Sequence, residues 1–483
     1  MAKILLLNPP SRHGEAVVRD NLYGCFTKGK ANYVWPPLAL AEVAATLEAR
    51  GNECRIIDGV VAKRSLKQIA SDAREWGAEY LFIITGTPTL NYDLEVAAEI
   101  KRACHATVLF SGSVCTLAAE KVFQDGTVDY ALLGEPDLST PELVDALEKG
   151  GRSPSTVKGI SYMSDGEIKS TGPADLIEDL NVLPFPARHL IPNAEYFNPL
   201  AKRLPYTTIF TSRGCPFHCI FCPSKLLYGG KFRPRSAENV VAEMEECVKK
   251  YGIREFFIRD ETFTLDKKRV LDICRLMQAK GLRVDWICNS RVDTIDKEMM
   301  IAMKKAGCHL VKYGVESGSQ RVLDYLEKGI TLERTRQTFK EMHETGIDSV
   351  AHFMMGSPGE TREDIEATIR FAREIDPDYA SFNITIPMPG TELWNRVKDK
   401  LPAHSGDLYD IEKNLVEGTF SEAISDIPRR EIEKYYNDAH RHFYLRPSYI
   451  LKRLRKMGSL DELVRTTRAG AYLLAFTLKR KTK

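Results

Sequence analysis

Short apolar runs alternate with amphipathic stretches through the first 150 residues of the chain. The runs have the length of buried strands, and the stretches between them repeat apolar residues with helical spacing. Five such units predict a parallel sheet wound with helices on both faces, over residues 1–150. The expected strands are 3–7, 53–58, 80–85, 107–111 and 130–133, and examples of the helices are 37–50 and 91–104.

Small and polar residues follow these expected strands, in Asn8-Pro9-Pro10, Thr85-Gly86-Thr87, Ser111-Gly112-Ser113 and Gly134-Glu135. Ligands of such sheets bind outside the carboxyl ends of the strands. Small residues there let a bulky cofactor approach the backbone. We therefore expect cofactor contacts from Thr85, Ser111, Gly112, Ser113 and Glu135.

The rest of the chain divides into three parts. Residues 151–200 predict a linker with one hairpin, in which GISYMSDGEIKS reads as strand, Asp-Gly turn and strand. Residues 201–400 repeat the strand–helix rhythm six times and predict a partial (β/α)6 barrel, with its chemistry at the carboxyl ends of the strands. Residues 401–483 predict a mainly helical region that is basic towards its end.

Composition is that of an ordinary globular protein, with 43% hydrophobic and 28% charged residues among 483. The net charge of +2 gives no argument for nucleic acid as a partner. The beginning MAKILLLNPPSRHGE predicts a strand rather than a signal peptide, and no apolar run reaches the roughly 18 residues of a spanning helix. We therefore expect a cytoplasmic protein whose eleven cysteines stay reduced.

Three of these cysteines stand in the run TSRGCPFHCIFCPS, directly after the first expected barrel strand. Cys215, Cys219 and Cys222 have the spacing C-x3-C-x2-C. Three thiolates this close can each bind one iron of a four-iron four-sulfur cluster, which leaves the fourth iron open. An open iron is a place for a substrate to bind, as is the open position on a catalytic zinc.

Two other interpretations explain the cysteine run less well. A structural zinc site needs four Cys or His ligands, and His218 is the candidate for the fourth. Because His218 is next to Cys219 in the chain, the two side chains are poorly placed to bind the same small ion. A disulfide framework does not suit a long chain without a signal peptide. The other eight cysteines are expected to be small core residues.

The cluster run resembles that of the radical S-adenosylmethionine superfamily. The resemblance implies that the amino and carboxylate groups of S-adenosylmethionine bind the open iron. It further implies that one electron, from a donor such as flavodoxin or ferredoxin, cleaves this molecule to methionine and a 5'-deoxyadenosyl radical. In YGVESGSQ, which contains Gly314, the resemblance implies that Glu316 holds the ribose hydroxyls; the alternative is a capping or salt-bridged glutamate.

The resemblance also assigns roles at other expected strand ends. In FMMGSPGET, Gly356 and Gly359 would contact the nucleoside while also forming a turn and helix start. Asp260 or Glu261 would lie near the methionine amino group, and Arg291 would pair with the methionine carboxylate, although charges at strand ends are common. Phe221 either shields the cluster, packs near the adenine or is an ordinary core aromatic.

With the N-terminal part included, residues 1 to about 400 resemble the cobalamin-binding subgroup, which includes methylases and the anaerobic porphyrin cyclase. The matching features are NPP, WPPLALAEVAATLEARG, GEPDLSTPELVDAL, KGISY, LPFPARHL, GVESGSQ and GSPGET. The Asp-x-His-x-x-Gly signature of proteins that bind cobalt through histidine is absent, and Ser111-Gly112-Ser113-Val114 replaces the Gly-Gly-x-His run of the subgroup. His105 is expected at the wrong edge of the sheet, whereas His13 stays open. The resemblance thus implies cobalamin without a histidine ligand.

The main hypothesis is a cobalamin-dependent radical enzyme that methylates an unactivated carbon of a small-molecule or lipid-like substrate. The alternative keeps the cofactors but performs a cyclisation, ring contraction or oxidative rearrangement. A methylthiotransferase acting on nucleic acid fits less well, because residues 1–150 lack a second cysteine trio.

The basic C-terminal region leaves two interpretations open. Its mixture of basic residues, aromatics and leucines suits peripheral association with anionic lipid headgroups. It equally suits a helical cap that packs on the barrel. The residues are Arg446, Lys452, Arg453, Arg455 and Lys456 with Phe443, Tyr444, Tyr449, Ile450, Leu451 and Leu454.

Overall fold

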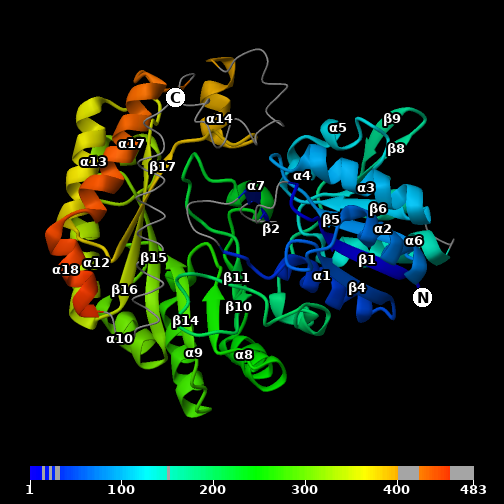
Figure 1. Cartoon of the computed structure of the whole chain (residues 1–483), viewed down its shortest axis with the longest axis horizontal. Helices are drawn as coiled ribbons and strands as arrows, with labels where there is room; N and C mark the ends of the chain where they lie inside the picture. The colour runs from blue at the N-terminus through cyan, green and yellow to red at the C-terminus, as the bar shows by residue number, and fades with distance from the viewer. Residues whose placement is uncertain (13–16, 21–23, 28–32, 150–152, 401–423, 457–483) are drawn as a thin grey trace.

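The computed structural model describes residues 1–12, 17–20, 24–27, 33–149, 153–400 and 424–456. Figure 1 shows two α/β bodies side by side, the N-terminal one in blue and cyan and the second in green to orange. Each is built on one large, mainly parallel sheet, which confirms the fold class predicted from the alternation of apolar runs and amphipathic stretches.

The N-terminal sheet has the strand order β4-β1-β5-β6-β7-β8-β9. The first five strands are parallel, and the expected hairpin adds β8 and β9 as antiparallel strands beside β7, so the sheet continues past residue 150. The chain changes direction across the sheet between β1 and β5, and ligands bind at the carboxyl edge of such a point. The strands are β1 (Lys3–Asn8), β4 (Glu53–Asp58), β5 (Tyr80–Ile84), β6 (Thr107–Ser111), β7 (Tyr130–Leu132), β8 (Ile160–Ser164) and β9 (Glu167–Ser170).

Helices cover both faces of this sheet, because its strands carry apolar side chains on both sides. Leu6 and Phe82 belong to one buried cluster with α1 and α6, and Leu5 and Ile83 belong to another with α2 and α3. A small separate hairpin joins β2 (Val17–Asp20) and β3 (Gly24–Thr27). The helices are α1 (Leu38–Glu48), α2 (Leu66–Trp76), α3 (Leu90–Cys104), α4 (Ser113–Leu117), α5 (Ala119–Val122) and α6 (Pro136–Lys149).

The second sheet has the parallel order β10-β13-β14-β15-β16-β17, which agrees with the six units expected for a partial barrel. Its strands are β10 (Tyr206–Ile209), β13 (Glu255–Ile258), β14 (Asp285–Ser290), β15 (Cys308–Glu316), β16 (Asp348–Met355) and β17 (Tyr379–Ile384). The helices along it are α8 (Ala237–Tyr251), α9 (Lys267–Ala279), α10 (Lys297–Lys305), α11 (Gln320–Tyr325), α12 (Leu332–Thr345) and α13 (Arg362–Glu374).

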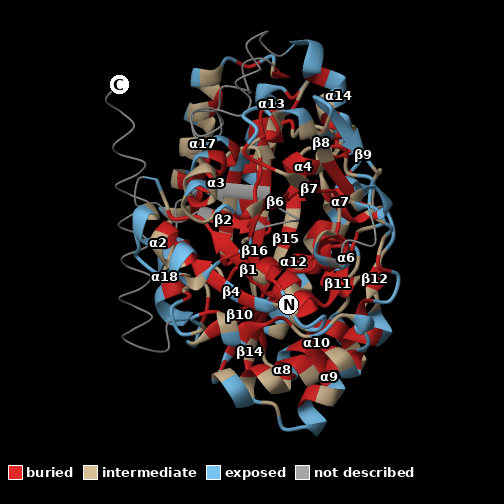
Figure 2. Ribbon diagram, turned by 90° about the vertical axis from the view of Figure 1, so that its right-hand side faces the viewer, coloured by how far each residue is buried: buried red, intermediate tan, exposed pale blue. Residues whose placement is uncertain are grey.

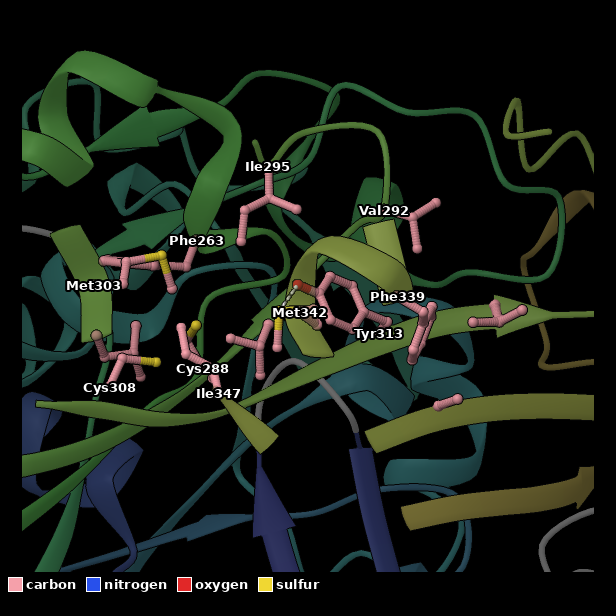
Figure 3. Packing of buried hydrophobic residues seen from close by; sticks show 14 of the residues in the cluster. Phe263, Cys288, Val292, Ile295, Met303, Cys308, Tyr313, Phe339, Met342 and Ile347 are labelled. Carbon is pink, nitrogen blue, oxygen red and sulfur yellow. Dashed lines mark hydrogen bonds between the residues drawn. The ribbon is translucent and has the colours of Figure 1, made fainter. Parts of the chain in front are cut away.

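The core of the barrel lies between its strands and these outer helices. Figure 3 shows Tyr313 of β15 against Phe339 and Met342 of α12, with its hydroxyl donating to the Met342 sulfur at 3.2 Å. Cys288 and Cys308 lie in the same cluster, and burial is the main cause of the raised pKa of the Cys288 thiol. A neutral buried thiol is a packing group rather than a ligand, as expected for these cysteines.

The described C-terminal region is helical and docks on the barrel. Its helices are α17 (Arg429–Tyr444) and α18 (Pro447–Lys456), α14 (Glu392–Val397) comes before this region, and residues 401–423 and 457–483 lie outside the described residues. Lys452 and Lys456 of α18 form ion pairs with Asp376 and Asp378, with nitrogen–oxygen distances of 2.9 and 2.5 Å. Figure 2 shows buried residues gathered along the two sheets and exposed ones on outer helices. Within the described residues, no helix has the length and apolar content needed to cross a membrane.

Candidate active site

The three cysteines of the expected cluster site lie on one loop between β11 (Ser212–Arg213) and α7 (Ser224–Tyr228). The base of this loop is closed where β11 pairs with β12 (Arg233–Pro234). Cys215, Cys219 and Cys222 are partly exposed, as is Cys104, whereas the buried cysteines are Cys54, Cys115, Cys247, Cys274, Cys288 and Cys308. Burial raises the pKa of Cys222 to about 12, and the nearby thiols of Cys219 and Cys215 add to this rise.

These thiols fit an iron–sulfur cluster. Among the described residues, no three Cys, His, Asp or Glu side chains converge closely enough to hold a single metal ion. Thiolates that ligate a cluster bind separate irons, so they need not converge on one point. Metal binding would also deprotonate the three thiols, which burial otherwise opposes at Cys215 and Cys222.

Glu261 ties together the two ends of the cluster loop. Its Oε1 accepts hydrogen bonds from the backbone N–H of Gly214 at 3.1 Å and from the Ser224 hydroxyl at 3.0 Å. Burial raises the pKa of this carboxyl to about 7. Its neighbour Asp260 is fully buried and accepts hydrogen bonds from the Thr211 N–H and the Ser212 hydroxyl, both at 2.6 Å. Both carboxylates therefore hold the two ends of the loop, which we call its stem, in place.

Two cations lie beside the cluster loop. Arg291 is buried, with Nη1 3.7 Å from the Cys219 sulfur and its guanidinium carbon 3.6 Å from the Phe217 ring centre. Its Nη2 donates to the backbone oxygen of Lys328 at 2.8 Å and so links the two cations. The Lys328 ammonium lies 6.0 Å from the Phe221 ring centre. Positive charges here fit the carboxylate of a bound amino acid.

Glu316 is the partner of Lys328. It ends β15 in the left-handed region, with φ 65°, which is rare for a residue other than glycine. Its Oε1 accepts from Lys328 Nζ at 2.9 Å, and both side chains are buried. Gly314 makes this possible, because a Cβ there would lie 2.2 Å from Oε1 and 2.8 Å from Nζ.

The other barrel residues predicted to contact S-adenosylmethionine lie either in a turn or in a small apolar cluster. Gly356 has φ 81°, and its N–H donates to Oε2 of Glu360 at 2.6 Å, so the expected turn is present. Gly359 also has positive φ, and Thr361 caps α13 through Asp364. Phe221 is partly buried against a small apolar cluster that includes Leu326 and Leu393, which is core packing beside the cysteine loop.

A hydrogen-bonded polar network occupies the carboxyl edge of the N-terminal sheet. Asn8 donates to Asp58 at 2.8 Å, and Arg19 pairs with Asp93 at 2.8 Å while also donating to Asn8 at 3.1 Å. The Thr85 hydroxyl donates to Asp93 at 2.8 Å. The network thus joins the ends of β1, β4 and β5, where the sheet offers its binding crevice. The sequence pattern did not reveal Arg19, Asp58 or Asp93, because the network depends on residues up to 74 positions apart.

Two buried hydroxyls at this edge fit a bound ligand. The Ser111 hydroxyl at the end of β6 and the Ser11 hydroxyl after β1 are buried with no hydrogen-bond partner in the described structure. Ser113, also buried, begins α4. Gly112 serves the fold itself: its φ is 118°, and a Cβ would lie 2.0 Å from the Thr85 carbonyl oxygen. Polar atoms left without partners at a strand end are suited to a polar cofactor such as cobalamin.

The two histidines considered for the cobalt atom have separate outcomes. His105 caps the end of α3 just before β6, at the amino edge of the sheet, as expected. His13 lies outside the described residues.

Buried ion pairs join the two domains directly at the stem of the cluster loop. Arg213, just before the loop, donates to both oxygens of Asp137 at 2.7 and 2.9 Å. Arg233, on β12 after α7, donates to Glu135 Oε2 at 3.0 Å, and the Ile177 N–H donates to the same oxygen at 3.2 Å. Glu135, expected at the cofactor, is thus engaged in the domain interface. These arginines hold the cysteine loop against the carboxyl edge of the N-terminal sheet.

Comparisons with known proteins agree with this two-domain site. The family model of the radical SAM superfamily matches residues 209–372, and that of the B12 binding domain matches residues 24–144. An uncharacterized methyltransferase of Pyrococcus horikoshii is 34% identical over 462 residues, which cover 93% of this chain and 94% of that protein. The anaerobic magnesium-protoporphyrin IX monomethyl ester cyclase of Cereibacter sphaeroides is 28% identical over 82% of this chain and 67% of its own.

A solved structure shares the fold. The radical S-adenosylmethionine methyltransferase TsrM of Kitasatospora setae, with cobalamin and a [4Fe-4S] cluster bound, has a TM-score of 0.67 at 19% identity, and the match covers 83% of this chain and 75% of that one. The two family models and the long relative together define the class: the chain belongs to the cobalamin-binding radical S-adenosylmethionine family. Its cofactors are a four-iron four-sulfur cluster, S-adenosylmethionine and cobalamin.

Proposed function

We propose that the protein is a C-methyltransferase that acts on an unactivated carbon of a small-molecule substrate. The observation that carries the proposal is the pair of arginines, Arg213 and Arg233, that fixes the cysteine loop against the cobalamin-binding sheet. When bound, the cluster and S-adenosylmethionine supply one-electron chemistry and cobalamin carries a methyl group, so both must face one substrate.

The residues of the chain have distinct tasks in this proposal. Cys215, Cys219 and Cys222 ligate the cluster and leave one iron open. Arg291 and Lys328 bind the carboxylate of the methionine part through charge-assisted hydrogen bonds. Glu316 exchanges its ammonium partner for the ribose hydroxyls. Ser111 and Ser113 face cobalamin together with Thr85. The buried carboxylates Glu261 and Asp260 hold the loop in place.

The test is anaerobic reconstitution with cluster, cobalamin and S-adenosylmethionine, followed by incubation with metabolite extracts and mass spectrometry. Methylation predicts a product that is heavier than its precursor by one CH2 and that takes up label from methyl-labelled S-adenosylmethionine. The similarity to the cyclase supports a second candidate, a cyclisation or rearrangement. That candidate predicts a product without methyl label, and such a result would overturn methyl transfer.

The electron donor is proposed to be an acidic carrier such as flavodoxin or ferredoxin, with the chain in the cytoplasm. Lys225 of α7 and His218 of the cluster loop are both exposed, with Nζ 3.4 Å from Nδ1. An exposed cation beside the cysteines attracts an acidic partner. Lys225→Glu should slow reduction by flavodoxin at low salt and leave reduction by dithionite unchanged; equal rates with flavodoxin would contradict the docking.

We also propose that α18 rests on a lipid surface. Its lysines and the buried Tyr449 face the barrel, while Ile450, Leu451 and Leu454 are 47%, 48% and 52% exposed, so these three apolar side chains face outward. An outward apolar face with flanking cations suits an interfacial helix. Leu451→Ser with Leu454→Ser should reduce sedimentation with anionic liposomes, whereas Leu138→Ser on α6, also an exposed leucine, should not. Equal sedimentation of all three proteins would exclude this surface.

A further inference from the structure

The interior of the barrel is layered, with an apolar floor and a polar level above it. Phe257, Ile287, Leu310 and Val350 form a buried cluster on the inner face of β13 to β16. Side chains of a strand alternate between faces, and Val311, Tyr313 and Val315 of β15 pack outward on the helices. Lys312 must therefore face inward, one inward position beyond Leu310 on its own strand and in register with Val350 of β16. The same reasoning places His352 of β16 inward, between Val350 of the floor and the carboxyl ends of the strands, which form the mouth of the barrel.

Lys312 and His352 lie on adjacent strands and are partly exposed, unlike the floor beneath them. Each of these two side chains thus keeps some accessible surface above the floor. Lys312 Nζ lies 4.9 Å from the Phe257 ring centre and has no carboxylate partner within the described part of the chain. Above the floor, the described inward strand positions carry a single carboxylate, Glu316, which is already paired with Lys328.

The charges around this level share one sign. Burial and then the positive charge of Arg259 lower the pKa of Lys312 to about 8. Burial, followed by the charges of Lys312 and Lys328, lowers the pKa of His352 to about 3. Arg259 itself is buried against the Trp35 ring at 4.1 Å. An anion placed between Lys312 and His352 would relieve this excess of positive charge.

We propose that Lys312 and His352 bind an anionic group of the substrate, a carboxylate or a phosphoryl group, inside the barrel. This inference rests on the proposed function, because it names the class of substrate that would be methylated. Lys328 connects the two places: it lies close enough to lower the pKa of His352, and it pairs with Glu316 beside the cluster loop. A substrate anchored by its anion at this depth would direct its other end towards the cluster and cobalamin.

The test measures binding without turnover, on the reconstituted protein, with inorganic phosphate and acetate as probes. Lys312 is labelled by formaldehyde and cyanoborohydride, and the labelling is quantified by peptide mass spectrometry. A bound anion covers the amine and raises its pKa, so labelling of Lys312 should slow at least about fivefold. Exposed Lys340 on α12 is the internal control and should not change. Protection by phosphate alone assigns a phosphoryl group, and protection by acetate alone assigns a carboxylate.

The variant His352→Ala should raise the anion concentration needed for half-protection about tenfold, the effect of one hydrogen bond to a charged group. His343→Ala, an exposed histidine on α12, is the matched control and should leave protection unchanged. Labelling of Lys312 at one rate with and without both anions would overturn the proposal, and so would undiminished protection in His352→Ala. Either result would leave methyl transfer standing, while a failure to find a methylated product would leave anion binding standing.

Discussion

The ammonium group of Lys328 donates to Glu316, with Nζ 2.9 Å from Oε1, where the backbone of Glu316 has entered the left-handed region. A residue other than glycine in that region costs about 1–3 kcal/mol, so surrounding structure must hold it there. Burial by itself would lower the pKa of Lys328, but the negative charges of Glu316 and Cys219 and the hydrogen bond to Glu316 together outweigh burial, and the pKa is raised. Lys328 therefore stays charged and is available to a polar ligand.

Glu316→Gln should weaken the binding of S-adenosylmethionine, because a neutral amide replaces a charged acceptor of the ribose hydroxyls. We expect the dissociation constant to rise by about tenfold or more, equivalent to roughly 1.5–3 kcal/mol for a hydrogen bond to a charged group. Iron content should stay normal. Glu327→Gln, an exposed glutamate in the next turn, is the control. An unchanged dissociation constant in Glu316→Gln would leave this residue with a structural role alone.

Cys219→Ala should remove the cluster and with it all cleavage of S-adenosylmethionine, because the open-iron arrangement needs all three thiolates. Iron and sulfide analysis measures this directly. Cys247→Ala is the control: Cys247 is buried on α8, and burial raises the pKa of its thiol to about 12. Normal iron in Cys219→Ala would refute the ligand assignment.

The sequence predicted the parts of this molecule that depend on local pattern. The apolar runs located the strands of both sheets, and the spacing of Cys215, Cys219 and Cys222 located the cluster loop on a turn between a strand and a helix. The hairpin of residues 160–170 was also visible, but its pairing with β7 was not, because register across a sheet edge leaves no signal in one strand.

Ion pairs between residues far apart in the chain could not be predicted from the sequence. Glu135 was expected at the cofactor because it follows a strand, whereas its oxygens accept from Arg233, which lies 98 residues further along. Lys328 was missed for the same reason: it follows a short helix and meets Glu316 only through the turn of the chain. A carboxylate at a strand end looks the same in sequence whether it meets a ligand or an arginine.

Gly112→Ala should destabilise the N-terminal domain by more than about 2 kcal/mol, because a clash is added to backbone strain. The new Cβ would lie 2.0 Å from the Thr85 carbonyl oxygen, at φ 118°. Gly126→Ala is the matched control, since Gly126 has φ 72° but open space around it. Urea unfolding should show a smaller loss for the control, about 1 kcal/mol from strain alone. Equal losses in the two variants would contradict the close approach.

Glu42 should make stability depend on pH. Burial raises the pKa of this carboxyl from 4.5 to about 7, although Arg213 lowers it in part. Between these values the unfolded carboxyl is ionised while the folded one keeps its proton, so stability falls as the pH rises through this window. Glu42→Gln should remove this fall and gain on the order of 2 kcal/mol relative to the natural protein between about pH 5 and 8.

Urea unfolding midpoints of Glu42→Gln and the natural protein, measured at about pH 5 and about pH 8, test the effect of Glu42. The exposed Glu142 on α6 serves as the control, and Glu142→Gln should show no such gain. A difference between Glu42→Gln and the natural protein that stays constant with pH would show that Glu42 is ionised throughout.

The buried pairs Arg213–Asp137 and Arg233–Glu135 make it costly to separate the two domains even slightly at their interface. Breaking one buried pair strands uncompensated charges, at about 3–5 kcal/mol each. A gap wide enough to admit a corrinoid by parting the domains at this joint would strand two guanidinium groups and two carboxylates together. We therefore expect bound cobalamin to leave slowly, so that exchange with labelled cobalamin in solution takes longer than many turnovers. In kinetic terms, the corrinoid stays bound through many turnovers, and only its methyl group is transferred in each one.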